Sequence, residues 1–110
     1  MLELESLPEL PVLLLDASIE DAIRGAIART AAGSFLTLAP AAARDVVKAV
    51  RRVLESEGVG HVVLLTQPDV RRFVRKLIEI DFPDLPVASY AELLPEIALR
   101  PVGKASLAGL

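Results

Sequence analysis

Asp16 is the residue whose type and position are most typical of catalysis in this chain. It directly follows the aliphatic run Val-Leu-Leu-Leu, and open α/β sheets keep their catalytic groups at the carboxyl ends of such strands. A carboxylate nucleophile or phosphoacceptor there would need companion acids to hold Mg²⁺. The nearby acids, Glu20 and Asp21, fall in the first turn of a predicted helix, where the helix dipole already explains them. We favour strand-end solvation and capping for Asp16, and a small enzyme or phosphoacceptor domain centred on it is the alternative.

His61 is the single histidine and the other candidate for acid–base chemistry. It begins a predicted strand, and the sequence places neither a nucleophile nor an orienting acid beside it. The glycines just before it, in Glu-Gly-Val-Gly-His, precede a strand, whereas phosphate-binding glycines follow a strand and open a helix. The chain has no cysteine, which excludes disulfides and cysteine zinc sites. We therefore expect a protein that is not an enzyme, with no catalytic residue, cofactor or metal.

Four cations crowd one predicted helix: Arg71, Arg72, Arg75 and Lys76. They form two like-charge pairs at i, i+4, and each such pair destabilises an isolated helix by a few tenths of a kcal/mol. Nucleic acid is a poor match for this cationic ridge because the chain has net charge −3 and only 4% aromatic residues. A protein partner is the functional interpretation, and a plain solvated helix face is the structural one.

Strand-like and helix-like segments alternate along the chain. We expect strands over 12–16, 34–38, 61–66, 86–89 and 96–102, the last at a sheet edge because it contains Pro101. The first helix is expected to begin at Ser18, with Asp21 completing a capping-box-like start, and to end at Gly33. Another begins at Pro40 and ends near Gly58.

The clearest helix follows Pro68, where apolar residues fall at i, i+3, i+4, i+7 and i+8 from Val70. After it, Ser89 and Glu92 have the spacing of a capping box for a brief helix.

This alternation predicts an α/β fold, a small sandwich with a largely parallel sheet of four or five strands built from βαβ units, with helices packed around it. We expect a lead-in or linker over 1–11, a single domain over 12–105 and a tail over 106–110. The longest apolar runs are too short to span a bilayer, and the acidic N-terminus is unlike a secretory signal. We therefore expect a cytosolic domain that makes no membrane contact.

Two stretches resemble the last cytosolic subdomain of type III secretion export gate proteins (the SctV/FlhA-like family). One is LPVLLLDASIEDAIRGAIARTAAGSFLTLAP, and the other, more specific, is VVLLTQPDVRRFVRKLIEIDFPDLPVASYAEL. The closing IALRPVGK is similar to the family's last strand. The Arg-Arg-x-Val-Arg-Lys wording favours the virulence-injectisome branch over the flagellar branch. Ala88 and Lys104 depart from the usual larger aliphatic residue and arginine.

The resemblance implies a longer protein with an N-terminal membrane portion in the bacterial inner membrane and four cytosolic subdomains, of which this chain would be the fourth. Such proteins assemble as a ring of export gate subunits that receives secretion chaperone–substrate complexes and gatekeeper proteins, without enzymatic activity. The cationic ridge, with Tyr90 and Glu92 nearby, is then a hypothetical partner or inter-subunit surface. Pro83 and Pro86, which follow the ridge and precede Tyr90, are interpreted as architecture.

Overall fold

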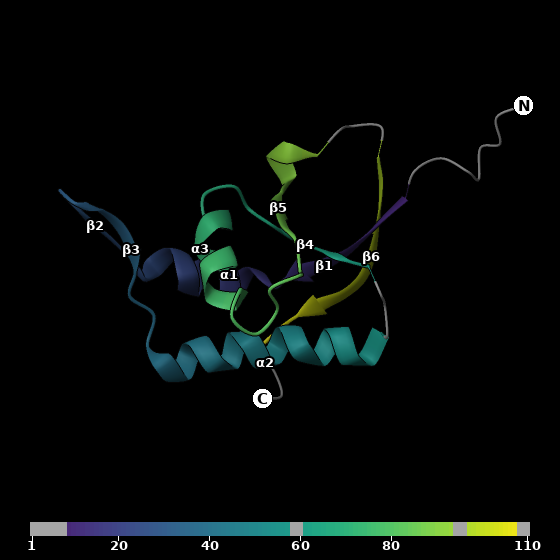
Figure 1. Ribbon diagram of the computed structural model, residues 1–110, viewed down its shortest axis with the longest axis horizontal. Coiled ribbons are helices and arrows are strands. Elements are labelled where there is room, and N and C mark those ends of the chain that lie inside the picture. The colour runs from purple at the N-terminus through teal and green to yellow at the C-terminus, as the bar shows by residue number, and fades with distance from the viewer. Residues whose placement is uncertain (1–8, 58–60, 94–96, 108–110) are drawn as a thin grey trace, which may run out of the picture.

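A four-stranded parallel sheet forms the centre of the computed structural model, and three α-helices pack around it (Figure 1). The structure describes residues 9–57, 61–93 and 97–107. The elements in chain order are β1 (Glu9–Leu15), α1 (Ala17–Gly25), β2 (Ile27–Thr30), β3 (Gly33–Leu36), α2 (Pro40–Glu57), β4 (Val63–Thr66), α3 (Arg71–Ile78), β5 (Val87–Ser89), the 3₁₀ turn η2 (Tyr90–Glu92) and β6 (Ala98–Ala105).

The sheet has the order β5-β4-β1-β6, and all of its pairings are parallel. β1 is central, pairing with β4 from Val12↔Val63 and with β6 from Glu9↔Ala98. The predicted α/β class with a largely parallel sheet is confirmed. β6 is an edge strand, where Pro101 is tolerated because a missing N–H costs little on the solvent side. The strand continues to Ala105, beyond the predicted end at residue 102.

The first helix is shorter than the sequence predicts. α1 ends at Gly25 instead of Gly33, and Ile27–Thr30 forms β2, which pairs with β3 as an antiparallel hairpin separate from the main sheet. Thr37 donates both its backbone N–H, at 2.7 Å, and its hydroxyl, at 2.6 Å, to the Ala26 carbonyl. These bonds satisfy the carbonyl at the helix end, and the chain leaves the helical path there. The hairpin projects from one end of the molecule (Figure 1).

The start of α1 also differs from the prediction. Asp16, not Ser18, is the N-cap, and its carboxylate accepts hydrogen bonds from the backbone N–H and the hydroxyl of Ser18. These two bonds, the hydroxyl bond first, hold the pKa of the Asp16 carboxyl below its ordinary value. β1 starts at Glu9, three residues before the predicted strand, because Glu9–Pro11 pair with the start of β6. The predicted helix end near Gly58 lies outside the described residues.

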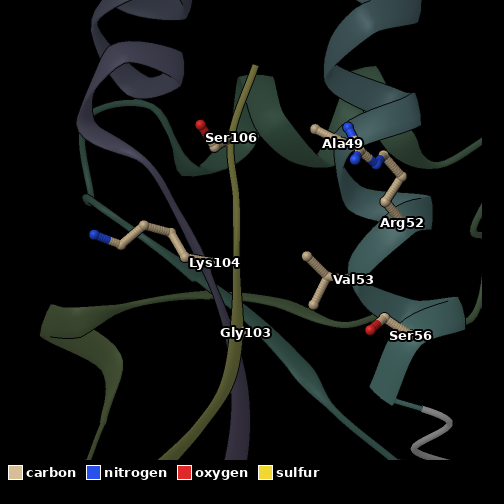
Figure 2. A pocket seen from close by; sticks show the side chains of 7 residues that line it. All are labelled: Ala49, Arg52, Val53, Ser56, Gly103, Lys104 and Ser106. Atoms are coloured by element: carbon tan, nitrogen blue, oxygen red, sulfur yellow. The ribbon is translucent and has the colours of Figure 1, made fainter. Parts of the chain in front are cut away.

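The core is aliphatic, as the low aromatic content requires. Leu13, Leu64 and Leu65 of the central strands are fully buried, and α2 lies against β6 and α3 while α3 lies against β5. Figure 2 shows where β6 passes close to α2, with Gly103 facing Val53. A Cβ at Gly103 would lie only 2.5 Å from Val53 Cγ1. Close packing of β6 on α2 therefore requires glycine here.

No helix in the described ranges is long and apolar enough to cross a membrane.

Candidate docking surface on α3

The buried stripe of α3 fixes which of its side chains face outward. Phe73, Val74 and Ile78 are buried, together with Val70 just before the helix. The predicted spacing is confirmed, apart from the half-buried Leu77. Because apolar side chains occupy the inward stripe, the cations between them lie on the outer face. Residues 70–78 thus position the cationic ridge that the sequence singled out.

Arg71 lies beside the turn that follows β5. Its Nε is 2.5 Å from Glu92 Oε1 in an ion pair. The buried Nε–H does not have the geometry of a hydrogen bond. The same Glu92 oxygen accepts the Ser89 backbone N–H at 2.8 Å, so Glu92 reaches back to Ser89 as predicted. The hydrogen bonds from Ser89, the backbone N–H first, and then the charge of Arg71 hold the pKa of the Glu92 carboxyl below its ordinary value. Arg71 and Glu92 therefore connect α3 to η2.

Tyr90 begins η2 and is 43% exposed. Partial burial, followed by the negative charge of Glu20, raises the pKa of its phenol. Glu92 thus lies at the start of α3 through its ion pair with Arg71, and Tyr90 is two residues before it in the same turn.

Arg75 has a structural partner on each branch of its guanidinium. Nη1 donates to the Leu85 carbonyl and Nη2 to the Pro83 carbonyl, both at 3.0 Å. These bonds tie the loop between α3 and β5 to the helix, and they orient the segment that enters β5. Arg75 therefore stabilises the fold. The sequence could not predict this role, because every residue has a backbone carbonyl and residue types do not show which carbonyls a side chain will bind.

Arg72 and Lys76 are the two most available cations of the ridge. The Arg72 guanidinium lies 4.8 Å from the centroid of the Phe73 ring. Arg72 is nevertheless exposed to solvent. Lys76 has a side chain that is 78% exposed and lies 3.8 Å from Glu79, a weak ion pair at the surface. One helical turn separates them, so both point from the same face of α3.

An open groove of about 620 Å³ separates this face of α3 from the hairpin. The hairpin side consists of Ser34, Phe35 and Leu36, and the helix side carries Phe73 between the cations. Phe35 is 51% exposed, which is high for a phenylalanine, so its ring is the largest apolar feature that the hairpin presents to solvent. The groove combines an apolar floor with a cationic rim. The sequence predicted the cations but not the groove, because the hairpin supplies one of its sides.

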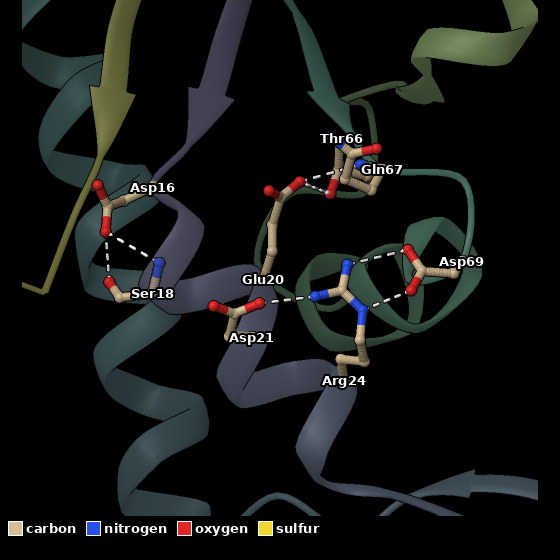
Figure 3. Close-up of polar contacts among 8 residues, drawn as sticks. All are labelled: Asp16, Ser18, Glu20, Asp21, Arg24, Thr66, Gln67 and Asp69. Atoms are coloured by element: carbon tan, nitrogen blue, oxygen red, sulfur yellow. Dashed lines mark hydrogen bonds and ion pairs between the residues drawn. The ribbon is translucent and has the colours of Figure 1, made fainter.

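Two polar clusters hold α1 against the loop that leads into α3 (Figure 3). Arg24 makes a bidentate pair with Asp69, with Nε–Oδ2 at 2.5 Å and Nη2–Oδ1 at 3.1 Å. Its hydrogen bonds and charge lower the pKa of the Asp69 carboxyl. The buried Glu20 accepts the Thr66 hydroxyl at 2.7 Å and the Gln67 N–H at 2.9 Å. These partners are more than 40 residues apart in sequence, so no local signal predicted them.

Asp16 and His61 do not share a site. Asp16 follows β1 at the carboxyl edge of the sheet, whereas His61 precedes β4 at the opposite edge. Arg52 and Lys104 both line a groove between α2 and β6. Figure 2 shows their side chains on opposite sides of β6, so the two charges do not point toward one another. Within the described residues, no group of three or more His, Asp or Glu side chains is placed to hold a metal ion.

Residues 3–98 match the model of the FHIPEP family. The chain belongs to the FHIPEP family. It is 40% identical over 100 residues to low calcium response locus protein D of Yersinia pestis, and the aligned region covers 89% of this chain and 14% of that protein. Identity to the flagellar biosynthesis protein FlhA of Bacillus subtilis is 33% over 96 residues, or 86% of this chain and 14% of FlhA. This chain thus spans about one seventh of the length of these family members.

Two solved structures extend the family match to three dimensions. The Chlamydia pneumoniae CdsV protein, in a structure of its complex with CdsO, is 46% identical with a TM-score of 0.81 over 93% of this chain and 31% of that one. The nonameric EscV cytosolic domain from the type III secretion system is 34% identical with a TM-score of 0.68, over 88% of this chain and 29% of that one. Relatives of this chain thus include type III secretion proteins, and the cytosolic domain of one of them, EscV, is nonameric. The resemblance drawn from the sequence, with its preference for the injectisome branch, is confirmed.

Proposed function

We propose that this chain is the fourth cytosolic subdomain of a type III secretion export gate and that the α3 surface is where it meets export partners. In this proposal the whole protein is anchored in the bacterial inner membrane and assembles as a ring on the cytoplasmic side. Its partners are neighbouring gate subunits, secretion chaperone–substrate complexes and gatekeeper proteins. The domain contributes recognition and entry of export cargo and catalyses no reaction.

One observation carries the proposal: an apolar groove with an exposed cationic rim lies on the outer face of α3. Apolar area gives affinity, and charges at the rim select the partner and speed its approach. The nonameric EscV structure supports the ring, and the CdsV–CdsO complex supports a secretion partner for a related domain.

The contacts within the chain divide the proposed surface into two parts. Arg71, Arg75 and Glu92 are held by neighbours in the same chain and shape the surface. Arg72, Lys76 and Tyr90 are exposed and present it to a partner. A charge reversal at Arg75 would damage the loop as well as the surface, so the informative pair is Arg72 with Lys76.

The test is secretion by cells whose full-length export gate protein carries Arg72→Glu with Lys76→Glu. We expect secretion to fall about tenfold or more while the protein level stays normal, because reversed rim charges repel the partner. Lys48→Glu with Arg52→Glu is the matched control, since these cations are also exposed and one turn apart, but on α2. Unchanged secretion in the α3 variant would remove this surface as a functional site.

A further inference from the structure

The groove between the hairpin and α3 defines the chemistry of an occupant. Its floor is formed by Phe35 and Leu36 of β3 and by Phe73 of α3. Phe35 is half exposed, and covering an aromatic ring of this kind is a main source of binding energy at protein interfaces. An occupant must therefore present apolar side chains toward this floor.

The rim has one dominant sign of charge. Arg72 and Lys76 lie on the helix side of the groove, and Glu79 is the single acid among its lining residues. The chain as a whole has net charge −3, so the cationic field is local to this groove. Carboxylates on an occupant would complement the two cations, and basic occupants would be repelled.

The spacing of the two cations matches one turn of a helix. Their Cβ atoms are about 6 Å apart, which is also the separation of two carboxylate-bearing residues at i, i+4 on another helix. A helix with an apolar stripe flanked by acids would place the stripe on the floor and the acids on Arg72 and Lys76. Resting on the proposed function, we propose that this groove binds an acidic amphipathic helix of an export partner.

The absence of cysteine from the chain makes a direct test possible. Ala32→Cys places one thiol in the exposed turn between β2 and β3, next to the groove, for labelling with an environment-sensitive fluorophore. The probe is a synthetic helical peptide with leucines at i, i+3, i+4 and i+7 and glutamates beside them. A second peptide has lysine in place of every glutamate, and a third has the glutamates but a central proline that breaks the helix.

We expect the acidic helical peptide to change the fluorescence saturably, and the lysine and proline peptides to bind at least about tenfold more weakly. Arg72→Glu with Lys76→Glu should weaken the acidic peptide by a similar factor and reduce the salt dependence of its binding. Phe35→Ser should weaken it too, whereas Lys48→Glu with Arg52→Glu should leave it unchanged.

Equal binding of the lysine peptide would overturn the acidic character of the occupant, and equal binding of the proline peptide would overturn its helical form. A fluorescence change produced by unlabelled chain alone would show that a second copy covers the groove, and it would also overturn the inference. If the α3 variant loses secretion while the labelled chain ignores the acidic peptide, this inference fails and the proposed function stands. If secretion is unaffected, the α3 surface fails as the site where export partners bind, whatever the peptide does.

Discussion

The two hydrogen bonds of Arg75 give a test of whether this residue serves the fold. Replacement by methionine keeps most of the apolar stem but removes the guanidinium that binds the carbonyls of Pro83 and Leu85. A hydrogen bond from a charged group contributes about 1.5–3 kcal/mol. Since the Pro83 bond is exposed to water, we take low values and expect Arg75→Met to lower the free energy of unfolding by about 2–3 kcal/mol.

Urea and thermal unfolding of the 110-residue chain, followed by circular dichroism, measure this loss. For a domain of this size it corresponds to a fall in Tm of about 10 °C. The matched control is Arg72→Met, whose guanidinium lies over the Phe73 ring and has no other partner among the contacts described above. It should cost about 0.5–1 kcal/mol.

A midpoint for Arg75→Met within experimental error of the wild type would refute the reasoning. It would mean that water replaces the guanidinium at both carbonyls without cost. Arg75 would then return to the group of cations available to a partner, beside Arg72 and Lys76.

Two further predictions concern packing and acid stability. Gly103→Ala should destabilise the fold by about 1–3 kcal/mol because the new methyl overlaps the stiff, β-branched Val53. In a Val53→Ala background the same change should lower the free energy of unfolding clearly less. Equal losses in the two backgrounds, measured by urea titration, would contradict the close contact. For Asp69, whose folded-state pKa is lowered by Arg24, the stabilisation is present above the carboxyl's ordinary pKa and is lost as the pH falls through the lowered value. The difference in urea midpoint between wild type and Asp69→Asn should therefore shrink from pH 7 toward acid pH, and a constant difference would exclude this linkage.

Local sequence patterns were sufficient for several elements. The aliphatic runs predicted β1 and β4, the spacing from Val70 predicted α3, and Ser89 with Glu92 predicted the turn after β5. These signals succeed because the interactions that decide them lie within a few residues. The strand predicted over 34–38 is present as β3 (Gly33–Leu36), but its partner β2 was missed. Ile27–Thr30 is too short for its period to separate helix from strand, and only pairing with β3 resolves it.

Residue types and their spacing were enough to predict the α/β class, the parallel sheet, the family and the cationic ridge on α3. Tertiary structure alone decided how those cations are used, because the partners come from distant segments. Arg75 is bound by a later loop, Arg24 of α1 meets Asp69 45 residues on, and Phe35 faces α3 across the groove. The order of strands and the placement of the hairpin bring these groups together, and side-chain identity along the chain does not encode such long-range neighbours.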